Sequence, residues 1–328
     1  APAPAPAPEP SLSDAPSAAA ADAARETVVP AGAPTVPYWT DFRGPLRDGE
    51  YSERPISLSW SSAGLEPLWK RPAGGGYASF AIATGRAFTM EQRGRQEVVA
   101  AYDVLTGLEV WTVAWDAEFK ETMGGDGPRA TPTWADGRVY ALGATGELRA
   151  LAESDGRVIW RKNILDDNGA SNLDWGMAAA PLVVGDGVIV LPGGSNGRSV
   201  VAYHRDTGAR LWSALDDRQS YASPMLATLS DVRQLVVFSA ERLVGLDPEN
   251  GTLLWQYPWP GPNGINAAQP LVVDSDRLFL SSGYGAGAAV IEVSREGNRF
   301  SAREIWPNTR MNDLFASSVV HDRVIHGL

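Results

Sequence analysis

The residues of this chain that could carry acid–base or metal chemistry are few. It contains three histidines, His204, His321 and His326, and no cysteine. Disulfides, cysteine nucleophiles and thiolate metal sites are therefore excluded, and no pair of histidines has the spacing of a metal-binding motif. His204 stands where equivalent segments have a turn Asp, so we expect it to shape a turn. We predict no catalytic residue and no metal site.

A second set of residues has the chemistry of a binding site. It combines aromatic rings, amides and one guanidinium, each a few residues ahead of an apolar, strand-like run: Tyr77, Arg129, Trp175, Tyr221, Asn266 and Asn312. Such a mixture suits a pocket for a small ligand or a peptide. Arg129 would pair with an anionic group, and Trp175 would offer a stacking face. The same residues could instead cap loops, and both roles stay open.

These residues are positioned by a repeat that runs through most of the chain. The segment Ala101–Trp111, AYDVLTGLEVW, returns as ALAESDGRVIW, AYHRDTGARLW and GLDPENGTLLW, with a looser copy ending at Trp306. The tryptophans that end these units recur at intervals of 42 to 52 residues: Trp69, Trp111, Trp160, Trp212, Trp255 and Trp306. A unit of that length suits one four-stranded blade of a β-propeller.

Residues 131–161 illustrate the four strands of one unit. Strands are predicted at 131–135, 138–142, 147–151 and 157–161, separated by turns rich in Gly and Asp. Asp136 and Gly137 form a two-residue hairpin turn, because Gly accepts the positive φ that a twisted hairpin requires. The other first strands are expected to begin near Phe80, Pro181, Pro224, Pro270 and Ser318. The glycine-rich residues 283–287 lead into a strand, so we interpret them as a blade hairpin and not as a dinucleotide loop.

The blade geometry assigns a place to both sets of residues. Because the first strand of a blade is innermost, the six residues of the binding set fall at the rim of the central channel. The recurring tryptophans are expected to be structural, since each ring would pack on the next blade and bury on the order of 200 Å². The Gly ahead of each Trp supplies the left-handed turn that this arrangement needs.

Composition limits the partners. The net charge of −11 disfavours nucleic acid and anionic membrane surfaces, and the chain has no apolar run of about 18 residues that could span a bilayer. Residues 1–37 are dominated by Ala and Pro and are predicted to be a disordered linker. Such a stalk is typical of exported bacterial proteins. We therefore expect a periplasmic or extracellular location, with any membrane anchor ahead of residue 1.

The repeated A-x-D-x-x-T-G-x-x-x-W resembles the docking motif of pyrroloquinoline-quinone-type propellers, and residues 38–328 resemble the bacterial pyrroloquinoline-quinone-like repeat proteins. That family includes the propeller lipoprotein of the outer-membrane barrel assembly machinery. Residues 39–49 (WTDFRGPLRDG) and 125–132 (GDGPRATP) are similar to one branch of it. The resemblance implies an all-β propeller of eight blades when complete, closed by an N-terminal strand near 67–71. This chain would hold five complete blades, about 79–306, and part of a sixth, 316–328, so we expect it to be C-terminally truncated.

The family contains both dehydrogenases and scaffolds, so the fold does not decide the function. We expect a non-enzymatic binding or scaffold module without a cofactor, which takes a protein partner or a small ligand at the channel face. Two alternatives remain: a ligand-sensing module of a larger protein, and a quinoprotein dehydrogenase that binds pyrroloquinoline quinone and calcium. Against the dehydrogenase, the adjacent cysteine pair common in such alcohol dehydrogenases is missing, and no Glu-Asn-Asp calcium set is recognisable.

Overall fold

The computed structural model describes residues 38–52, 55–62 and 64–327. Within them the chain forms five four-stranded antiparallel sheets and one hairpin, and the four strands of each sheet are consecutive in sequence. The expected all-β fold of four-stranded propeller blades is confirmed. The Ala/Pro-rich segment 1–37 lies outside the described residues, so its assignment as a linker stays a prediction.

Each blade is a simple up-and-down sheet. The first consists of β1 (Ala81–Ala83), β2 (Arg86–Arg93), β3 (Gln96–Asp103) and β4 (Glu109–Asp116). The second consists of β5 (Thr133–Ala135), β6 (Arg138–Leu142), β7 (Glu147–Ala152) and β8 (Val158–Asn163). The third consists of β9 (Leu182–Val184), β10 (Gly187–Val190), β11 (Val200–His204) and β12 (Arg210–Ala214). The fourth consists of β13 (Met225–Leu229), β14 (Val232–Phe238), β15 (Arg242–Leu246) and β16 (Leu253–Pro258). The fifth consists of β17 (Leu271–Val272), β18 (Arg277–Ser282), β19 (Gly287–Glu296) and β20 (Arg299–Asn308).

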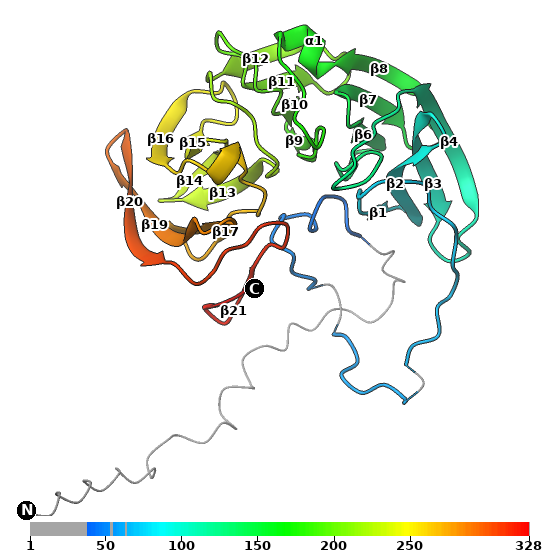
Figure 1. Ribbon diagram of the computed structural model, residues 1–328, viewed down its shortest axis with the longest axis horizontal. Helices are drawn as coiled ribbons and strands as arrows, with labels where there is room; N and C mark the ends of the chain where they lie inside the picture. The colour runs from blue at the N-terminus through cyan, green and yellow to red at the C-terminus, as the bar shows by residue number, and fades with distance from the viewer. Residues whose placement is uncertain (1–37, 53–54, 63, 328) are drawn as a thin grey trace, which may run out of the picture. The chain divides into compact units, whose positions relative to one another are not determined.

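The remaining elements are short. The hairpin of β21 (Val319–His321) and β22 (Val324–His326) follows the fifth blade. One α-helix, α1 (Ile164–Asn168), and one 3-10 helix, η3 (Pro262–Gly264), lie in loops between blades. Figure 1 shows the first strand of each blade innermost and the fourth outermost. The five complete sheets begin and end within a few residues of the expected positions, and the glycine-rich residues 283–287 form the turn between β18 and β19 as expected.

The register of the two outer strands repeats from blade to blade. The tryptophan of the fourth strand faces a residue of the third strand in every case: Trp111 faces Ala101, Trp160 faces Ala150, Trp212 faces Ala202, Trp255 faces Gly245 and Trp306 faces Val290. The register then shifts immediately after that third-strand residue. Such a bulge bends the strand and re-aims its side chains. The small residue opposite the tryptophan leaves room for the indole in four of the five blades.

The indoles pack on turn glycines of the following blade. Gly156 has a φ of +75°, and a Cβ placed on it would lie 2.7 Å from the ring of Trp111. Trp111 Nε1 also donates a hydrogen bond to the carbonyl oxygen of Glu153 over 2.8 Å. Glycine is required at this turn for two reasons: the backbone is left-handed, and the ring lies flush against the Cα. The same contact is made on Gly107, Gly208 and Gly251 by Trp69, Trp160 and Trp212.

The hydrophobic core lies between blades. Each cluster of buried side chains combines residues of two neighbouring sheets, as with Leu142 of β6 and Val201 of β11, or Phe238 of β14 and Leu280 of β18. Three further clusters join the first and second blades, the third and fourth, and the fifth blade with the hairpin. A blade therefore buries its apolar faces only against its neighbours, which is the organisation of a repeat protein.

Residues 39–49, here called the axial segment, lie against the inner strands of several blades. Trp39 exchanges two backbone hydrogen bonds of 2.7 Å with Ile82 of β1. The backbone N–H of Trp134 in β5 donates to the carbonyl of Thr40 over 2.9 Å. At the other end of the segment, Arg43 donates to the carbonyl of Ser318, just ahead of β21, over 2.8 Å.

Arg47 is the centre of the axial segment and is only 1% exposed. Its Nη1 donates to the carbonyl oxygens of Ala180 and Pro224, at 3.1 and 2.7 Å, which precede β9 and β13. Its Nη2 forms an ion pair with Asp41 at 2.5 Å. Burial raises the pKa of Asp41, and the positive charge of Arg47 opposes that rise. The axial segment thus connects four blades and the hairpin at their inner ends.

At the ends of the repeat, the structure bears on the predicted closing strand near 67–71 and on the first and last docking tryptophans. Residues 67–71 belong to no ladder within the described chain, so their role as a closing strand stays a prediction. Trp69 nevertheless docks, since its Nε1 donates to the carbonyl of Val104 over 2.8 Å. Trp306, the last of the predicted docking tryptophans, is 42% exposed. The number of blades in the complete protein also stays a prediction.

Candidate functional site

Four of the six expected rim residues come together at the ends of the blades. The guanidinium carbon of Arg129 lies 5.5 Å from the centre of the Tyr77 ring. The rings of Trp175 and Tyr221 lie 5.8 Å apart at an angle of 59°. Gly124 stands between the two pairs, because a Cβ on it would lie 3.2 Å from Trp175 and 3.5 Å from Arg129. Loops of different blades therefore meet where the innermost-strand argument placed them.

The guanidinium of Arg129 is engaged with its own loop. Nη2 donates to the carbonyl of Gly125 over 2.7 Å, and Nη1 donates to the carbonyl of Gly127. The same group lies 4.7 Å from the centre of the Phe119 ring. Burial lowers the pKa of Arg129, although the nearby Glu121 favours the charged form. Arg129 thus closes the loop between β4 and β5, and its contact with an anionic ligand stays a prediction.

The two expected amides serve the loops. Asn266 is fully buried; its Nδ2 donates to the carbonyl of Ser239 over 2.7 Å, and its Oδ1 accepts from Ser282 Oγ over 2.6 Å. Its carbonyl oxygen accepts the backbone N–H of Tyr221 over 3.1 Å. Asn312 Oδ1 accepts the backbone N–H of Gly287 over 3.1 Å. Neither amide lines the cavity described next, so contact of either with a ligand stays a prediction.

A cavity of about 740 Å³ opens beside Trp175 and Tyr221. Its walls come from residues 169–175, 193–195, 218–221 and 263–265, together with Met123 and Tyr284. Burial raises the pKa of Tyr221 to about 12, and the carboxylate of Asp174 acts in the same direction. This phenol is therefore neutral at physiological pH and can both donate and accept a hydrogen bond.

Two residues of this cavity are not among the six predicted from the sequence. Tyr284 is 55% exposed and has a φ of +55°, so its ring stands out from the turn between β18 and β19. Gln219 is 8% exposed, and its Nε2 donates to the carbonyl of Ser171 over 2.9 Å. Its Oε1 is buried and accepts no hydrogen bond from the described part of the chain. An aromatic residue inside a glycine-rich turn is the one sequence signal that could have pointed to Tyr284.

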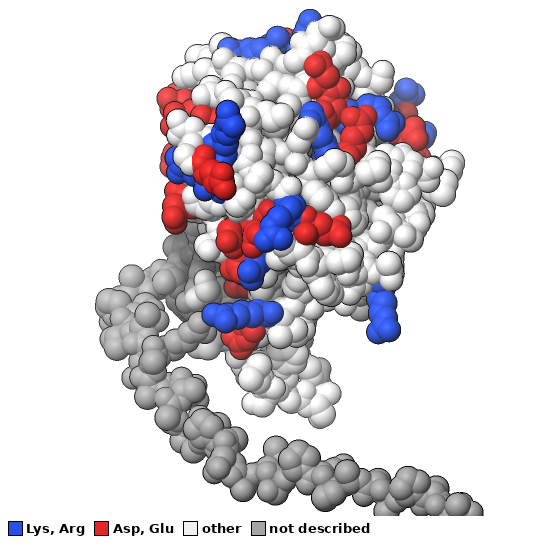
Figure 2. All heavy atoms as spheres, turned by 90° about the vertical axis from the view of Figure 1, so that its left-hand side faces the viewer, with Lys and Arg blue, Asp and Glu red and all other residues white. Residues whose placement is uncertain are grey.

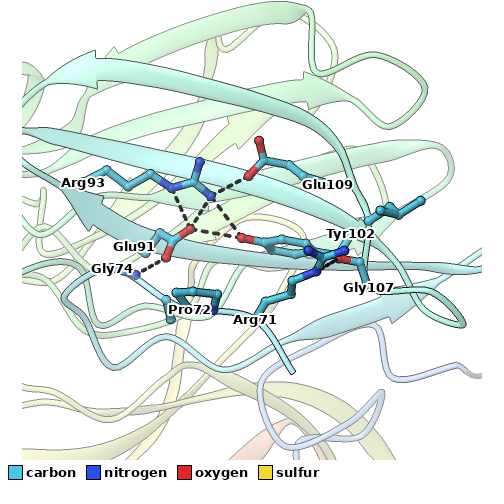
Figure 3. Close-up of a pocket in the computed structure, with 10 residues that line it drawn as sticks. Arg71, Pro72, Gly74, Glu91, Arg93, Tyr102, Gly107 and Glu109 are labelled. Carbon is cyan, nitrogen blue, oxygen red and sulfur yellow. Dashed lines mark hydrogen bonds and ion pairs between the residues drawn. The ribbon is translucent and has the colours of Figure 1, made fainter. Parts of the chain in front are cut away.

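A second cavity, of about 530 Å³, lies on the first blade and is shown in Figure 3. There the carboxylate of Glu91 accepts hydrogen bonds from Gly74 N, from Tyr102 Oη at 3.2 Å and from Arg93 Nε at 2.9 Å. Arg93 also forms an ion pair with Glu109 at 2.6 Å. These contacts raise the pKa of Arg93, the hydrogen bond to Glu109 most of all. The charged groups around this cavity satisfy one another and hold residues 71–74 on the sheet.

One buried carboxyl group lies between the first two blades. Glu97 of β3 is fully buried; its Oε1 accepts the backbone N–H of Ala144 over 2.7 Å, and its Oε2 accepts Trp115 Nε1 over 3.1 Å. Burial raises the pKa of Glu97 to about 7, against the effect of these two hydrogen bonds. Nothing in the sequence pattern distinguished Glu97 from an ordinary exposed strand residue.

The remaining chemistry-bearing residues are not assembled into a centre. Among the described residues, no group of three His, Cys, Asp or Glu side chains could hold a metal ion. His204 shapes a turn as expected, because its Nδ1 accepts the backbone N–H of Asp206 over 3.1 Å. On the face drawn in Figure 2, positive and negative side chains are interspersed. No helix in residues 38–52, 55–62 and 64–327 is long and apolar enough to cross a membrane.

Comparison with known proteins agrees with the repeat. The family model described as outer membrane protein assembly factor BamB matches residues 94–327. The protein of that name from Bordetella pertussis is 25% identical over 66% of this chain and 53% of its own length. The one from Shewanella oneidensis is 23% identical over 55% of this chain and 45% of its own length. The chain thus spans about half the length of the curated relatives it matches.

A solved structure supports the fold alone. The quinohemoprotein alcohol dehydrogenase of Comamonas testosteroni superposes with a TM-score of 0.50 over 72% of this chain and 45% of the enzyme. Its sequence identity to this chain is 17%. That similarity confirms the propeller architecture.

Proposed function

Because the chain belongs to the family of outer membrane protein assembly factor BamB, we propose that it is a non-enzymatic propeller that holds protein partners during outer-membrane protein assembly. The observation that carries the proposal is the family match over residues 94–327. That range contains the docking tryptophans from Trp111 to Trp306. The proposal places the protein outside the cytoplasm, at the outer membrane, which agrees with the Ala/Pro-rich residues 1–37.

The loops at the rim are the surface best suited to a partner. They come from several blades and expose an aromatic ring and a thioether, Tyr284 and Met123, at 55% and 84%. Exposed aromatic and Met side chains are enriched at protein interfaces. The rigid blades beneath them would hold the loops in place, which is the usual arrangement of a binding surface on a scaffold.

A quinoprotein activity is the alternative that the family resemblance raises. A cofactor in a propeller's channel would lie at the inner ends of the blades, and in this chain Arg47 and its partners occupy that position. The described residues also offer no group of three acidic or histidine side chains that could hold a metal ion. These residues do not fit a quinone–calcium site, and we derive no reaction step through that cofactor.

The proposal is tested by removing the gene in the source organism and measuring the amounts of folded outer-membrane β-barrel proteins. We expect those amounts to fall and to recover when the full-length protein is restored. A photo-crosslinking residue in place of Tyr284 should give adducts with components of the assembly machinery, and the same residue in place of Tyr257, on the outer strand β16, should not.

Two results would oppose the proposal. The first is an unchanged content of outer-membrane proteins in the deletion strain. The second is a thermal shift of the purified full-length protein with pyrroloquinoline quinone and Ca²⁺, accompanied by dye-linked alcohol oxidation. That second outcome would favour the dehydrogenase.

A further inference from the structure

The cavity beside Trp175 has two kinds of wall. One kind is aromatic: Trp175 and Tyr221 are inclined at 59° to each other, and the exposed ring of Tyr284 also belongs to the lining. The other kind is polar and planar, with the amides of Asn172, Gln219 and Asn263. The volume of about 740 Å³ falls within the range of ~300–1,000 Å³ that holds small ligands.

The polar wall contains an acceptor without a donor. Gln219 is more than nine-tenths buried, and its Nε2 is fixed on the carbonyl of Ser171, which orients the amide. Its Oε1 accepts no hydrogen bond from the described residues. A buried acceptor of this kind costs stability unless a donor meets it. That atom has almost no accessible surface, so the amides that a ligand hydroxyl can meet are those of Asn172 and Asn263, to which a hydroxyl can both donate and accept.

The charges of the cavity do not select an ion. Arg129, the cation at the rim, donates both of its terminal nitrogens to loop carbonyls. Arg218 lies 3.4 Å from Glu241 in an exposed ion pair, and Asp174 supplies one negative charge on the opposite loop. An anionic ligand such as a phosphate needs unpaired Arg or Lys donors. The balance of charge instead favours a neutral ligand.

We propose that this cavity binds a short neutral oligosaccharide. The C–H face of a pyranose ring is apolar and can pack on the electron-rich face of an indole or phenol ring, here Trp175 or Tyr284. The hydroxyls around the sugar's edge both donate and accept, which matches the amides of Asn172 and Asn263. This inference goes beyond the proposed function, although the cavity shares Tyr284 and Met123 with the rim surface proposed for protein partners.

The proposal is tested by calorimetric titration of the full-length protein with oligosaccharides of glucose and of N-acetylglucosamine. We expect saturable binding of at least one series, and a loss of affinity of about tenfold or more, about 1.4 kcal/mol, in Trp175→Ala. Trp60→Ala is the matched control, because Trp60 is 60% exposed and lies outside the cavity. Its affinity should equal that of the natural protein.

A further variant separates binding from folding. Tyr284→Ala removes an exposed ring and should keep the fold while weakening binding severalfold. Three outcomes would overturn the proposal: no saturable heat with any sugar, equal affinity of Trp175→Ala and Trp60→Ala, or binding of an aromatic peptide that Trp175→Ala abolishes while no sugar binds. None of these outcomes bears on the gene-deletion test of the proposed function.

Discussion

Replacing Arg47 by Met should destabilise the propeller by several kcal/mol, because Arg47 is buried at the inner ends of the blades and binds residues of several of them. The substitution keeps much of the side-chain volume but removes the ion pair with Asp41 and the hydrogen bonds to Ala180 and Pro224. Breaking one member of a buried ion pair costs about 3–5 kcal/mol, because the other charge stays buried without compensation. Each orphaned carbonyl adds about 1–3 kcal/mol where water cannot reach it. We therefore expect a loss of about 3–5 kcal/mol or more.

Urea unfolding followed by tryptophan fluorescence measures this loss, since the chain has 12 tryptophans. Arg310→Met is the control at an exposed position and should shift the midpoint little. The double variant Asp41→Asn with Arg47→Met should lose less than the sum of the two single variants, because the buried charge is no longer stranded. The reasoning is refuted if Arg47→Met costs less than about 1 kcal/mol, or no more than Arg310→Met.

Three other substitutions test separate features. Glu97→Gln should abolish a pH dependence of the free energy of unfolding. Because burial raises the pKa of Glu97 from 4.5 to about 7, the folded state favours the neutral acid, and up to about 3 kcal/mol of stability present below pH 4.5 is lost as the pH rises through 7. Unfolding at several pH values measures this loss, and an equal change of stability with pH in both proteins would contradict it. Gly156→Ala should lower the free energy of unfolding more than Gly137→Ala does. Both glycines have a φ of +75°, which alone costs about 1–2 kcal/mol, but only Gly156 would place a Cβ 2.7 Å from Trp111. Equal losses of stability in urea would show that the docking contact does not matter. Asn266→Ala should lower the free energy of unfolding by about 1–3 kcal/mol and leave the oligosaccharide affinity unchanged at temperatures where the variant is folded. A weakened affinity there would restore Asn266 to the binding site.

The blades were predictable because their determinants are local. The alternation of apolar strands with Gly and Asp turns placed the first strands near Phe80, Pro181, Pro224 and Pro270, and the structure begins them one residue later. The repeated Ala-to-Trp motif works for the same reason, since Ala101 and Trp111 face each other across one turn of one hairpin. Contacts within a single repeat fix the separation in sequence of the residues that make them, and that constant separation can be recognised.

The axial segment was not predictable in this way. Arg47 is 133 and 177 residues from Ala180 and Pro224, whose carbonyls it binds, and an arginine in a polar stretch with Gly44 and Gly49 reads as an exposed turn. Its burial follows from acceptors ahead of β9 and β13, in two different blades, which only the arrangement of the blades side by side brings into reach. The sequence-based argument proposed the rim loops from their place ahead of each first strand, and it could not tell which of their residues face a cavity. It singled out Arg129 and did not consider Tyr284, because it could not foresee that two loop carbonyls already hold the guanidinium.

The axial segment also has a mechanical consequence. Blades that contact only their neighbours would peel away one at a time from whichever end is pulled. A tension applied to the chain ahead of Trp39 instead reaches Ile82, the Asp41–Arg47 pair, Ala180 and Pro224 through separate hydrogen bonds. The load is thereby divided among four blades before any outer strand bears it. A tether at this end would strain the centre of the molecule evenly and leave the rim loops in register.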